Sequence, residues 1–290
     1  MKNAGAALRQ LINRPKLLVM PGAYDGFTAK LIEQAGFESV SMTGYGVSAT
    51  YGWPDVGLTT MNEMVDRAKV IARSVNIPLL ADADTGYGGI INVIRAIQEY
   101  EQAGVAGCHI EDQVSPKKCG SMKGKEVIPA EEMVAKIRAA LEARKDRDFV
   151  IVARTDSTAQ YDLDEAIRRC QMYEKAGADA IMIMAPGSPE NMARFNKAMS
   201  RPTFMPMGES ESMVRNIRMV PNDELERLGF RVALYPTSPL FAAGGAIRRT
   251  LQELKAKGTT EGLLDQMMRF QEITDLLGLP KIYEQEERYK

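Results

Sequence analysis

Two aspartates separated by one residue have the type and spacing expected of a site for a divalent cation. Asp82 and Asp84 end the apolar run that begins at Pro78, and a glycine-rich turn follows them. Carboxylates beside a flexible backbone suit Mg²⁺, or Mn²⁺ in its place, because these hard ions prefer oxygen ligands. The alternative is ordinary turn chemistry, since Asp is common in turns and at helix N-caps.

Further polar residues follow the other apolar runs of the chain. They are Asp25, Thr43-Gly44-Tyr45-Gly46, Glu111-Asp112-Gln113, Arg154-Thr155-Asp156, Glu209 and Thr237-Ser238. Active sites of parallel α/β proteins lie at the carboxyl ends of the strands. Acids gathered there with an arginine predict a site for a metal and an anionic substrate, because Arg binds a carboxylate through paired hydrogen bonds.

A polar, lysine-rich segment, residues 115–125, contains a cysteine preceded by two lysines. Its sequence is Ser-Pro-Lys-Lys-Cys-Gly-Ser-Met-Lys-Gly-Lys, which is too polar and too rich in Gly and Lys for a packed element. We interpret it as a mobile lid that brings Lys117 and Cys119 to the site. The lysines predict a lowered pKa for the Cys119 thiol, which could then act as an acid–base group. The alternative is a basic surface loop with an incidental cysteine.

Other reactive residues favour structural roles. His109 is the only histidine and lies inside an apolar run, so we interpret it as a hydrogen-bonded core residue. A single histidine also excludes most histidine metal sites and Ser-His-Asp catalysis. Cys108 and Cys170 are expected to be buried and inert. Trp53 has two interpretations, a wall of the pocket or ordinary loop packing.

The elements that must position these residues alternate strictly along the chain. The strand candidates are 17–20, 39–43, 78–82, 107–111, 149–154, 180–184, 203–207 and 232–236, and the helix candidates are 3–14, 27–34, 62–74, 92–102, 130–143, 163–175, 189–199 and 222–228. Several helices stop at a glycine just before the next strand, which is the expected C-cap signal. Alternation predicts a parallel sheet, and eight units predict a closed (β/α)₈ barrel of the TIM type.

No shift in composition marks a second domain, so residues 1–290 are predicted to form one barrel domain. A C-terminal helical extension, residues 243–290, is broken at 258–260 and 278–280. It is longer than one barrel helix needs, and it would have an apolar face. That face suits packing on a neighbouring subunit.

The composition excludes several classes of function. The chain is 45% hydrophobic and 26% charged with a net charge of −1, so nothing favours nucleic acid or an anionic membrane as a partner. No apolar run approaches the length of a membrane span, and the start of the chain lacks the core of a signal peptide. Three cysteines without C-x-x-C spacing argue against a disulfide framework or a zinc site. A reducing cytoplasm is therefore the expected location.

Four motifs stand in order along the chain. They are Asp-Ala-Asp-Thr-Gly-Tyr-Gly at 82–88, Glu-Asp-Gln at 111–113, Pro-Lys-Lys-Cys-Gly at 116–120 and Ala-Arg-Thr-Asp at 153–156. Together they resemble the isocitrate lyase/phosphoenolpyruvate mutase superfamily, most closely its short members related to 2-methylisocitrate lyase, dimethylmalate lyase and carboxyphosphonoenolpyruvate mutase. The likeness extends from Pro21 to Pro236.

The resemblance implies a role for each matching residue. Mg²⁺ would be held by Asp82 and Asp84, mostly through water, with Asp55 and Glu111 in support. The keto-acid half of the substrate would be held by Arg154 and the backbone of Thr43, Gly44, Tyr45 and Gly46. Lys117 and Cys119 would lie on a gating loop, and Cys119 would protonate the carbanion left after carbon–carbon cleavage. Further roles are implied for Tyr45 in catalysis and for Gly120, Ser121 and Glu209 in substrate binding.

The chain departs from the pattern of the lyases at three pocket positions. Ser121 takes the place of a His, Met184 that of a Glu and Pro206 that of an Asn. These changes make the pocket more apolar. We therefore expect a substrate that is smaller or less carboxylated than 2-methylisocitrate.

The sequence thus predicts a Mg²⁺-dependent lyase that cleaves a 2-hydroxy di- or tricarboxylate into a 2-keto acid and a second carboxylate. Alternatives within the superfamily are decarboxylation or hydrolysis of oxaloacetate, and a carboxyphosphonoenolpyruvate-type phosphonomutase. An alternative of another class is a keto-acid-binding protein with little turnover. The resemblance also implies a homotetramer, built as a dimer of dimers whose C-terminal helices are swapped.

Overall fold

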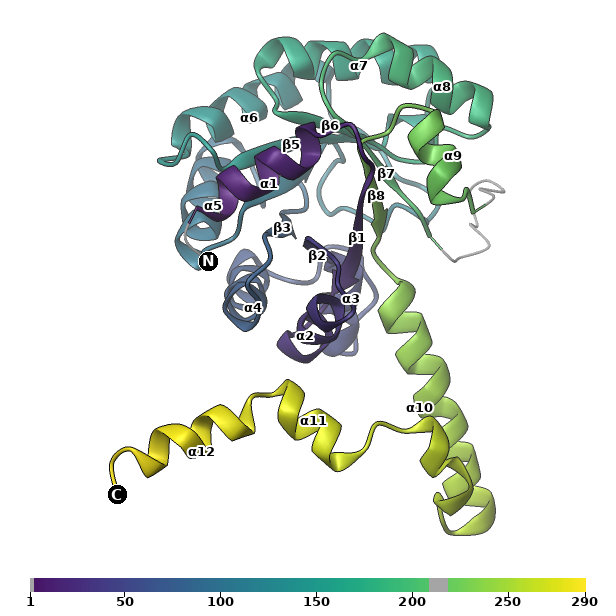
Figure 1. The fold of residues 1–290 in the computed structure, drawn as a ribbon. Helices are drawn as coiled ribbons and strands as arrows, with labels where there is room; N and C mark the ends of the chain where they lie inside the picture. Colours follow the sequence, from purple (N-terminus) through teal and green to yellow (C-terminus); the bar gives the residue numbers. More distant parts are fainter. Residues whose placement is uncertain (1–2, 209–218) are drawn as a thin grey trace.

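Eight parallel strands close into a barrel in the order of the sequence (Figure 1). The computed structural model describes residues 3–208 and 219–290, so the predicted substrate contact Glu209 lies outside the described residues. The strands are β1 (Leu18–Ala23), β2 (Val40–Met42), β3 (Leu79–Asp82), β4 (Gly107–Glu111), β5 (Val150–Thr155), β6 (Ala180–Ile183), β7 (Thr203–Pro206) and β8 (Val232–Tyr235). The predicted (β/α)₈ barrel is confirmed.

Helices cover the outside of the barrel and fill the connections between strands. They are α2 (Gly26–Gln34), α3 (Gly44–Thr50), α4 (Met61–Ser74), α5 (Ile90–Ala103), α6 (Ala130–Ala143), α7 (Leu163–Ala176), α8 (Pro189–Ala198) and α9 (Asn222–Arg227). A large buried cluster lies between these helices and the strands. Burial of this apolar layer supplies most of the stability of the fold.

A second apolar cluster fills the barrel interior. It contains Leu18, Met20, Leu80, Ala106, Val150, Val152, Ala180, Met182, Phe204, Val232 and Leu234, together with Leu8 and Ile12. The last two belong to α1 (Ala4–Asn13), which closes the amino-terminal end of the barrel with these fully buried side chains. The barrel is therefore a packed core at this end, and a pocket can open only at the other.

The alternation of side chains along the strands places charged residues on top of this core. Val150 and Val152 on β5 belong to the interior cluster, and Arg154 follows two residues later. In the same way, Leu80 on β3 is followed by Asp82. Because side chains on a strand alternate between its two faces, these charged residues also point into the barrel axis, at its carboxyl end.

The main differences from the predictions are at three places, and most other boundaries differ by one or two residues. Strand β1 runs on through Pro21 and Gly22, where the sequence predicted an end, because these two residues pair with neighbouring strands β8 and β2. Helix α3 was not predicted, and its first residues were named only as part of the polar segment that follows the second strand. The C-terminal helical segment begins at Ser238, five residues before the predicted start.

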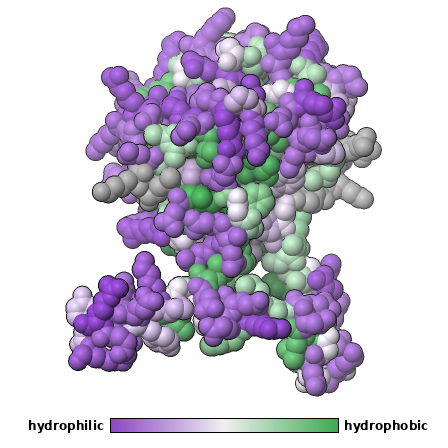
Figure 2. Space-filling model, in the orientation of Figure 1, coloured by the Kyte–Doolittle hydropathy of each residue, from purple (hydrophilic) through white to green (hydrophobic). Residues whose placement is uncertain are grey.

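The C-terminal segment extends away from the barrel as an arm. It consists of α10 (Ser238–Lys257), α11 (Phe270–Leu276) and α12 (Leu279–Glu287), and the last two lie below the barrel in Figure 1. None of the three helices contains a buried residue, and Figure 2 shows apolar surface on this part of the molecule. In the part of the chain that the structure describes, no helix combines the length and apolarity required to cross a membrane. The predicted exchange of helices between subunits stays a prediction.

Candidate active site

A pocket lies at the carboxyl ends of the strands and is lined from β2 to β8 and from segment 115–125, which we call the lid. Nine of the predicted site residues line it: Thr43, Tyr45, Asp55, Asp82, Lys117, Cys119, Gly120, Ser121 and Arg154. Gly44 and Asp84 are hydrogen-bonded to Asp82, and Glu111 is paired with Arg154. Every predicted site residue within the described ranges is therefore in the pocket or directly beside it, since Gly46 is held by Thr43.

The carboxylates are fixed by backbone hydrogen bonds. The amides of Asp84 and Gly44 donate to the two carboxylate oxygens of Asp82, at 3.0 and 3.2 Å. The amide of Glu111 donates to the carbonyl of Asp84 at 2.8 Å. Asp84 has a φ of +47°, a left-handed conformation that Asp tolerates better than most residues. The ends of β3 and β4 are thus held together with three buried acids side by side.

The buried charges of this site are not balanced among the described residues. Five acids meet three cations, namely Asp55, Asp82, Asp84, Glu111 and Asp156 against Lys117, Lys125 and Arg154. Burial, with Asp82 and Asp55 nearby, raises the pKa of Asp84 to about 6 despite Lys117. Burial also raises the pKa of Glu111 well above its usual value. For Asp82 burial acts in the same direction, but nearby positive charge outweighs it and lowers the pKa to about 2.

The donor set of these acids fits a divalent cation. Both carboxylate oxygens of Glu111, and Oδ1 of Asp55 and of Asp84, are buried without a hydrogen-bond partner among the described residues. Lys117 lies beside Oδ1 of both aspartates, and Arg154 lies beside Oε2 of Glu111. Within residues 3–208 and 219–290, no three His, Cys, Asp or Glu side chains are already arranged as ligands around one point. The ammonium group of Lys117 lies among the acids, with Nζ 2.6 Å from Asp55 Oδ1 and 2.7 Å from Asp84 Oδ1. Hard oxygen donors and an excess of two negative charges suit Mg²⁺ held partly through water.

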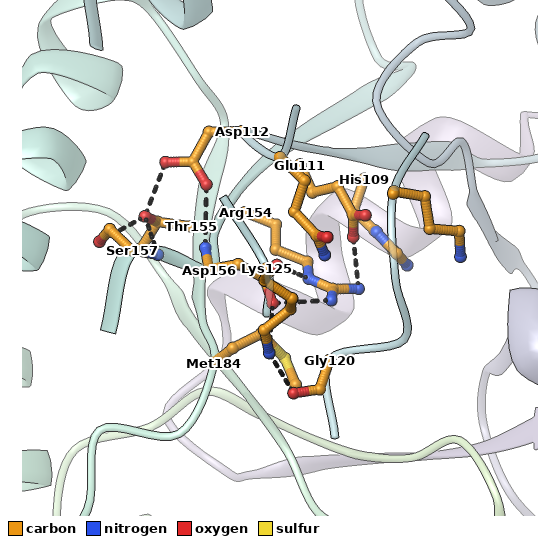
Figure 3. Close-up of polar contacts among 12 residues, drawn as sticks. His109, Glu111, Asp112, Gly120, Lys125, Arg154, Thr155, Asp156, Ser157 and Met184 are labelled. Carbon is orange, nitrogen blue, oxygen red and sulfur yellow. Dashed lines mark hydrogen bonds and ion pairs between the residues drawn. The ribbon is translucent and has the colours of Figure 1, made fainter. Parts of the chain in front are cut away.

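Arg154 is the cation at the centre of the pocket (Figure 3). Its guanidinium lies 2.8 Å from Glu111 Oε2, and its Nε donates to Asp156 Oδ2 at 2.8 Å. The end of β5 is held in turn by Asp112, whose carboxylate accepts hydrogen bonds from the Thr155 hydroxyl and the Asp156 amide. This buried scaffold fixes Arg154 in the lining of the pocket, where a guanidinium suits a substrate carboxylate.

Residues 43–46 form the amino end of helix α3. The hydroxyl of Thr43 accepts a hydrogen bond from the Gly46 amide, which is an N-cap. A Cβ on Gly44 would lie 2.6 Å from Asp82 Oδ2, so only glycine allows this approach of backbone to carboxylate. Tyr45 lines the pocket and meets Phe241 of α10 edge to face, at 5.9 Å between ring centroids. Backbone amides at this end can bind an anion.

The lid closes over the pocket from the side of β4. Its base is held by a bridge between Gln113 and Val127, and the amide of Cys119 donates to the carbonyl of Asp55 at 2.9 Å. The prediction of a lowered pKa for Cys119 is wrong. Burial, followed by the negative charge of Asp55, raises the pKa of this thiol. Lys117 does not reverse the effect, because its ammonium group is paired with two aspartates.

One side of the pocket is apolar. Strands β6, β7 and β8 and the positions just after them line it with one polar residue, Thr237, and otherwise with Met182, Met184, Ala185, Pro206, Met207, Gly208, Leu234 and Pro236. Charged groups come from β3 to β5 and from the lid, so the pocket has a charged half and an apolar half. Among the described residues, no cation lies in the apolar half.

Two residues, Asp25 and His109, have roles that differ from those considered from the sequence, and Trp53 follows the second of its two interpretations, ordinary loop packing. Asp25, expected among the polar strand ends, caps α2 by accepting hydrogen bonds from the Thr28 amide and hydroxyl, both at 2.7 Å. Trp53 is 39% exposed and stacks on Tyr51 without lining the pocket. His109 is buried as predicted, but it lines the pocket, and its Nδ1 has no hydrogen-bond partner among the described residues.

Sequence reasoning missed His109 as a pocket residue and Lys125 as a buried one. Burial is the main cause that lowers the pKa of His109, to about 4, so the ring is neutral at neutral pH. The signal for His109 was its position two residues before Glu111, on the same face of β4. Lys125 carried no such signal, because it is one of several lysines in a polar loop.

Comparison with known proteins gives a consistent result over nearly the whole chain. Residues 8–255 match the family model described as phosphoenolpyruvate phosphomutase. The chain is 46% identical to 2,3-dimethylmalate lyase of Eubacterium barkeri, over 99% of this chain and 98% of that protein.

Solved structures give the same picture. The fold is similar to that of oxaloacetate acetylhydrolase in complex with 3,3-difluorooxalacetate, with a TM-score of 0.93, 33% identity and coverage of 99% of this chain and 97% of that one. It is also similar to phosphonopyruvate hydrolase in complex with oxalate and Mg²⁺, with a TM-score of 0.88, 32% identity and 99% of both chains covered. A single barrel architecture thus accompanies several reactions of small anionic acids.

Proposed function

The chain belongs to the phosphoenolpyruvate phosphomutase family and is a carbon–carbon lyase of the isocitrate lyase/phosphoenolpyruvate mutase superfamily, and from this premise we propose that it cleaves an alkyl-substituted malate. The products would be a 2-keto acid and a second, shorter carboxylate. The reaction would depend on Mg²⁺.

The observation that carries this proposal is the division of the pocket into two halves. The charged half offers Arg154 and the acids that suit Mg²⁺, and these fit the carboxylate and oxygen of a keto-acid fragment. The apolar half offers methionine, proline and leucine side chains to the other fragment. A third carboxylate there would be buried without a cation to pair with among the described residues, which is costly, whereas methyl groups would be buried favourably.

Each polar residue has a distinct task in the proposed reaction. Arg154 and the start of α3 bind and orient the carboxylate of the keto-acid half. A base takes the proton of the substrate hydroxyl, and we assign this step to Tyr45 on the pocket wall, acting as its phenolate and becoming the neutral phenol. As the adjacent carbon–carbon bond breaks, its electron pair remains on the departing fragment, and Cys119 donates a proton to that carbanion. The raised pKa of Cys119 keeps the thiol protonated before this step.

A bound Mg²⁺ would be held by Asp82 and Asp84, with Asp55 and Glu111 in support. It would supply positive charge that stabilises the negative charge developing on the keto-acid fragment. The lid supplies the remaining requirement, because it separates the carbanion from bulk water until Cys119 has protonated it.

Proton and phosphorus NMR of the purified protein would test the proposal. The panel would contain 2,3-dimethylmalate, citramalate, 2-methylisocitrate, isocitrate, oxaloacetate and phosphonopyruvate, each with Mg²⁺ and with a chelator as control. We expect chelator-sensitive release of a 2-keto acid from an alkyl-substituted malate and little turnover of the tricarboxylates. Faster cleavage of 2-methylisocitrate would contradict the assignment of the apolar half. Turnover of oxaloacetate or phosphonopyruvate alone would replace the lyase reaction by hydrolysis or phosphorus–carbon chemistry.

A further inference from the structure

A buried lysine joins the lid to the wall of the barrel. Lys125, at the end of the lid, is only 4% exposed. Its ammonium group donates to the carbonyl of Gly120 and lies 3.1 Å from Asp156 Oδ1 (Figure 3). The Lys125 side chain therefore contacts the middle of the lid, at Gly120, and the fully buried carboxylate of Asp156, the residue that follows β5, at the same time.

The middle of the lid is seated tightly where Lys125 holds it. A Cβ built on Gly120 would lie 2.4 Å from Met184 Cε and 3.0 Å from Arg154 Nη2. Gly120 therefore packs directly against Arg154 and against the apolar half of the pocket. Because Cys119 is the preceding residue, the position of Gly120 also determines where the thiol lies.

Asp156 is a rigid anchor for this contact. Its two carboxylate oxygens accept hydrogen bonds from Arg154, at 2.8 and 3.3 Å, and its amide donates to Asp112 at 2.9 Å. Asp156 is shared between Arg154, which stays with the barrel, and Lys125, which belongs to the lid. An open lid would remove Lys125 from this carboxylate, so lid position and the surroundings of Arg154 are linked.

The other lysines of the lid make different contacts. Lys117 is bound to Asp55 and Asp84, which are proposed to hold the metal. Lys118 donates to the carbonyl of Gly124, within the lid itself. Lys123 is exposed. Lys125 is thus distinguished by a buried contact that joins the lid to a carboxylate of the barrel other than those proposed to hold the metal.

We propose that Lys125 is the latch of the lid, a positioning residue that holds Gly120 and Cys119 over Arg154 by binding Asp156. Burial strengthens the contact, because an ion pair that water does not reach is weakly screened. The consequence for turnover rests on the proposed lyase function, whereas the latch itself can be measured without turnover.

The native thiols provide that measurement. Cys108 and Cys170 are fully buried, and Cys119 is partly accessible, so Cys119 reports the state of the lid. The rate of alkylation by iodoacetamide would be measured for the full-length protein with Mg²⁺ and oxalate, at two pH values to separate thiol exposure from thiol pKa. The variants would be Lys125→Gln and Lys125→Met, which remove the charge, and Lys125→Arg, which retains it. Lys123→Gln is the control, with the same change of charge two residues away.

We expect Lys125→Gln and Lys125→Met to alkylate about tenfold faster than the wild type, as loss of a buried charge-assisted hydrogen bond implies. Lys125→Arg should recover part of the protection, and Lys123→Gln should react at the wild-type rate. Alkylation of Lys125→Gln at the wild-type rate, with a native circular dichroism spectrum, would overturn the proposal. Equal effects of Lys123→Gln and Lys125→Gln would also overturn it.

A kinetic measurement then separates the latch from the proposed function. On a compound that the wild type cleaves, Lys125→Gln should lower kcat about tenfold or more, since Cys119 and Arg154 are less well placed. Faster alkylation of Lys125→Gln supports the latch even if the wild type cleaves no compound of the panel, in which case the lyase assignment alone fails.

Discussion

At the scale of single residues, the pKa of the Cys119 thiol is set by its surroundings in the fold more than by the lysines that precede it in the sequence. Two lysines precede it, yet its pKa is raised, because burial disfavours the thiolate and because Lys117 turns its charge toward Asp55 and Asp84. A protonated thiol at neutral pH is suited to donate a proton and poorly suited to act as a nucleophile.

Replacement of Cys119 by serine tests this role. A serine hydroxyl occupies a similar volume but is a much weaker acid, so kcat for carbon–carbon cleavage should fall by about 10²- to 10⁴-fold. Binding of oxalate, measured by calorimetry with Mg²⁺, should be retained, because Arg154 and the carboxylates are unchanged. A variant that keeps its full rate would indicate a reaction without a positioned proton donor, such as decarboxylation.

The excess of buried negative charge leads to a prediction about the metal. Saturating Mg²⁺ should raise the thermal midpoint of the wild type by roughly 5 °C. This is the increase expected when a ligand binds only the native state and its free concentration is about 100 times its Kd. Asp84→Asn should lose most of this increase, whereas Asp66→Asn, at an exposed position of α4, should keep it. Thermal scans with Mg²⁺ and with a chelator measure both. An undiminished increase in Asp84→Asn would show that Asp84 does not hold the ion.

The raised pKa of Asp84 also predicts the pH dependence of stability in the metal-free protein. The native state binds a proton at Asp84 up to about pH 6, above the ordinary value of 3.8 that applies after unfolding. Between these values the native state holds more protons, so this group makes stability fall as pH rises. Urea unfolding with a chelator at several pH values should show a smaller fall in Asp84→Asn than in the wild type. An identical slope in the two proteins would contradict the assignment.

At the scale of elements, the N-cap residue of α2 is expected to affect stability and not activity. Asp25 follows β1, at the end of the barrel that carries the pocket, yet its carboxylate is used by Thr28. Asp25→Ala should lower the free energy of unfolding by about 1 kcal/mol, and Asp25→Asn by less, because asparagine also caps helices. Denaturant titrations check the stability, and kcat/KM should stay within about twofold of the wild type. A large loss of activity at unchanged stability would place Asp25 in the site after all.

The elements also show what could and could not be predicted from the sequence. Asp82 and Arg154 were predictable, because each ends a short continuous apolar run, which is typical of a buried parallel strand, and the carboxyl ends of such strands form the mouth of a barrel. Helix α3 was not, because Gly44 and Gly46 are weak helix formers, and the Thr43 cap and contact with Asp82 stabilise it instead. The burial of Lys125 depends on Asp156, 31 residues away, which no local pattern of a lysine-rich loop reveals.

At the scale of the whole molecule, the arm requires an explanation that one chain does not provide. Ile247, Leu251 and Leu254 are spaced by four and three residues, so they share one face of α10. They are 59%, 58% and 45% exposed. Oxaloacetate acetylhydrolase superposes on 99% of the chain, which includes the arm, so the arm has a defined position in a solved relative. We propose that a second copy of this chain covers the face, as the first step toward the predicted homotetramer.

A charge on that face should therefore separate the copies. In the proposed dimer, Leu251→Asp replaces an apolar contact between the two copies with a carboxylate that the second copy would bury. This should cost at least about 2 kcal/mol for each copy, and a symmetric interface contains the substitution twice. Light scattering after size-exclusion chromatography should show a smaller species for Leu251→Asp. Gln252→Asp introduces the same charge at the next, exposed position and should leave the mass unchanged. If both variants and the wild type had the mass of one chain, the arm would have no partner of its own kind. If all three had the same larger mass, the subunits would associate through another surface, and the apolar face of α10 would be left without a second copy to cover it.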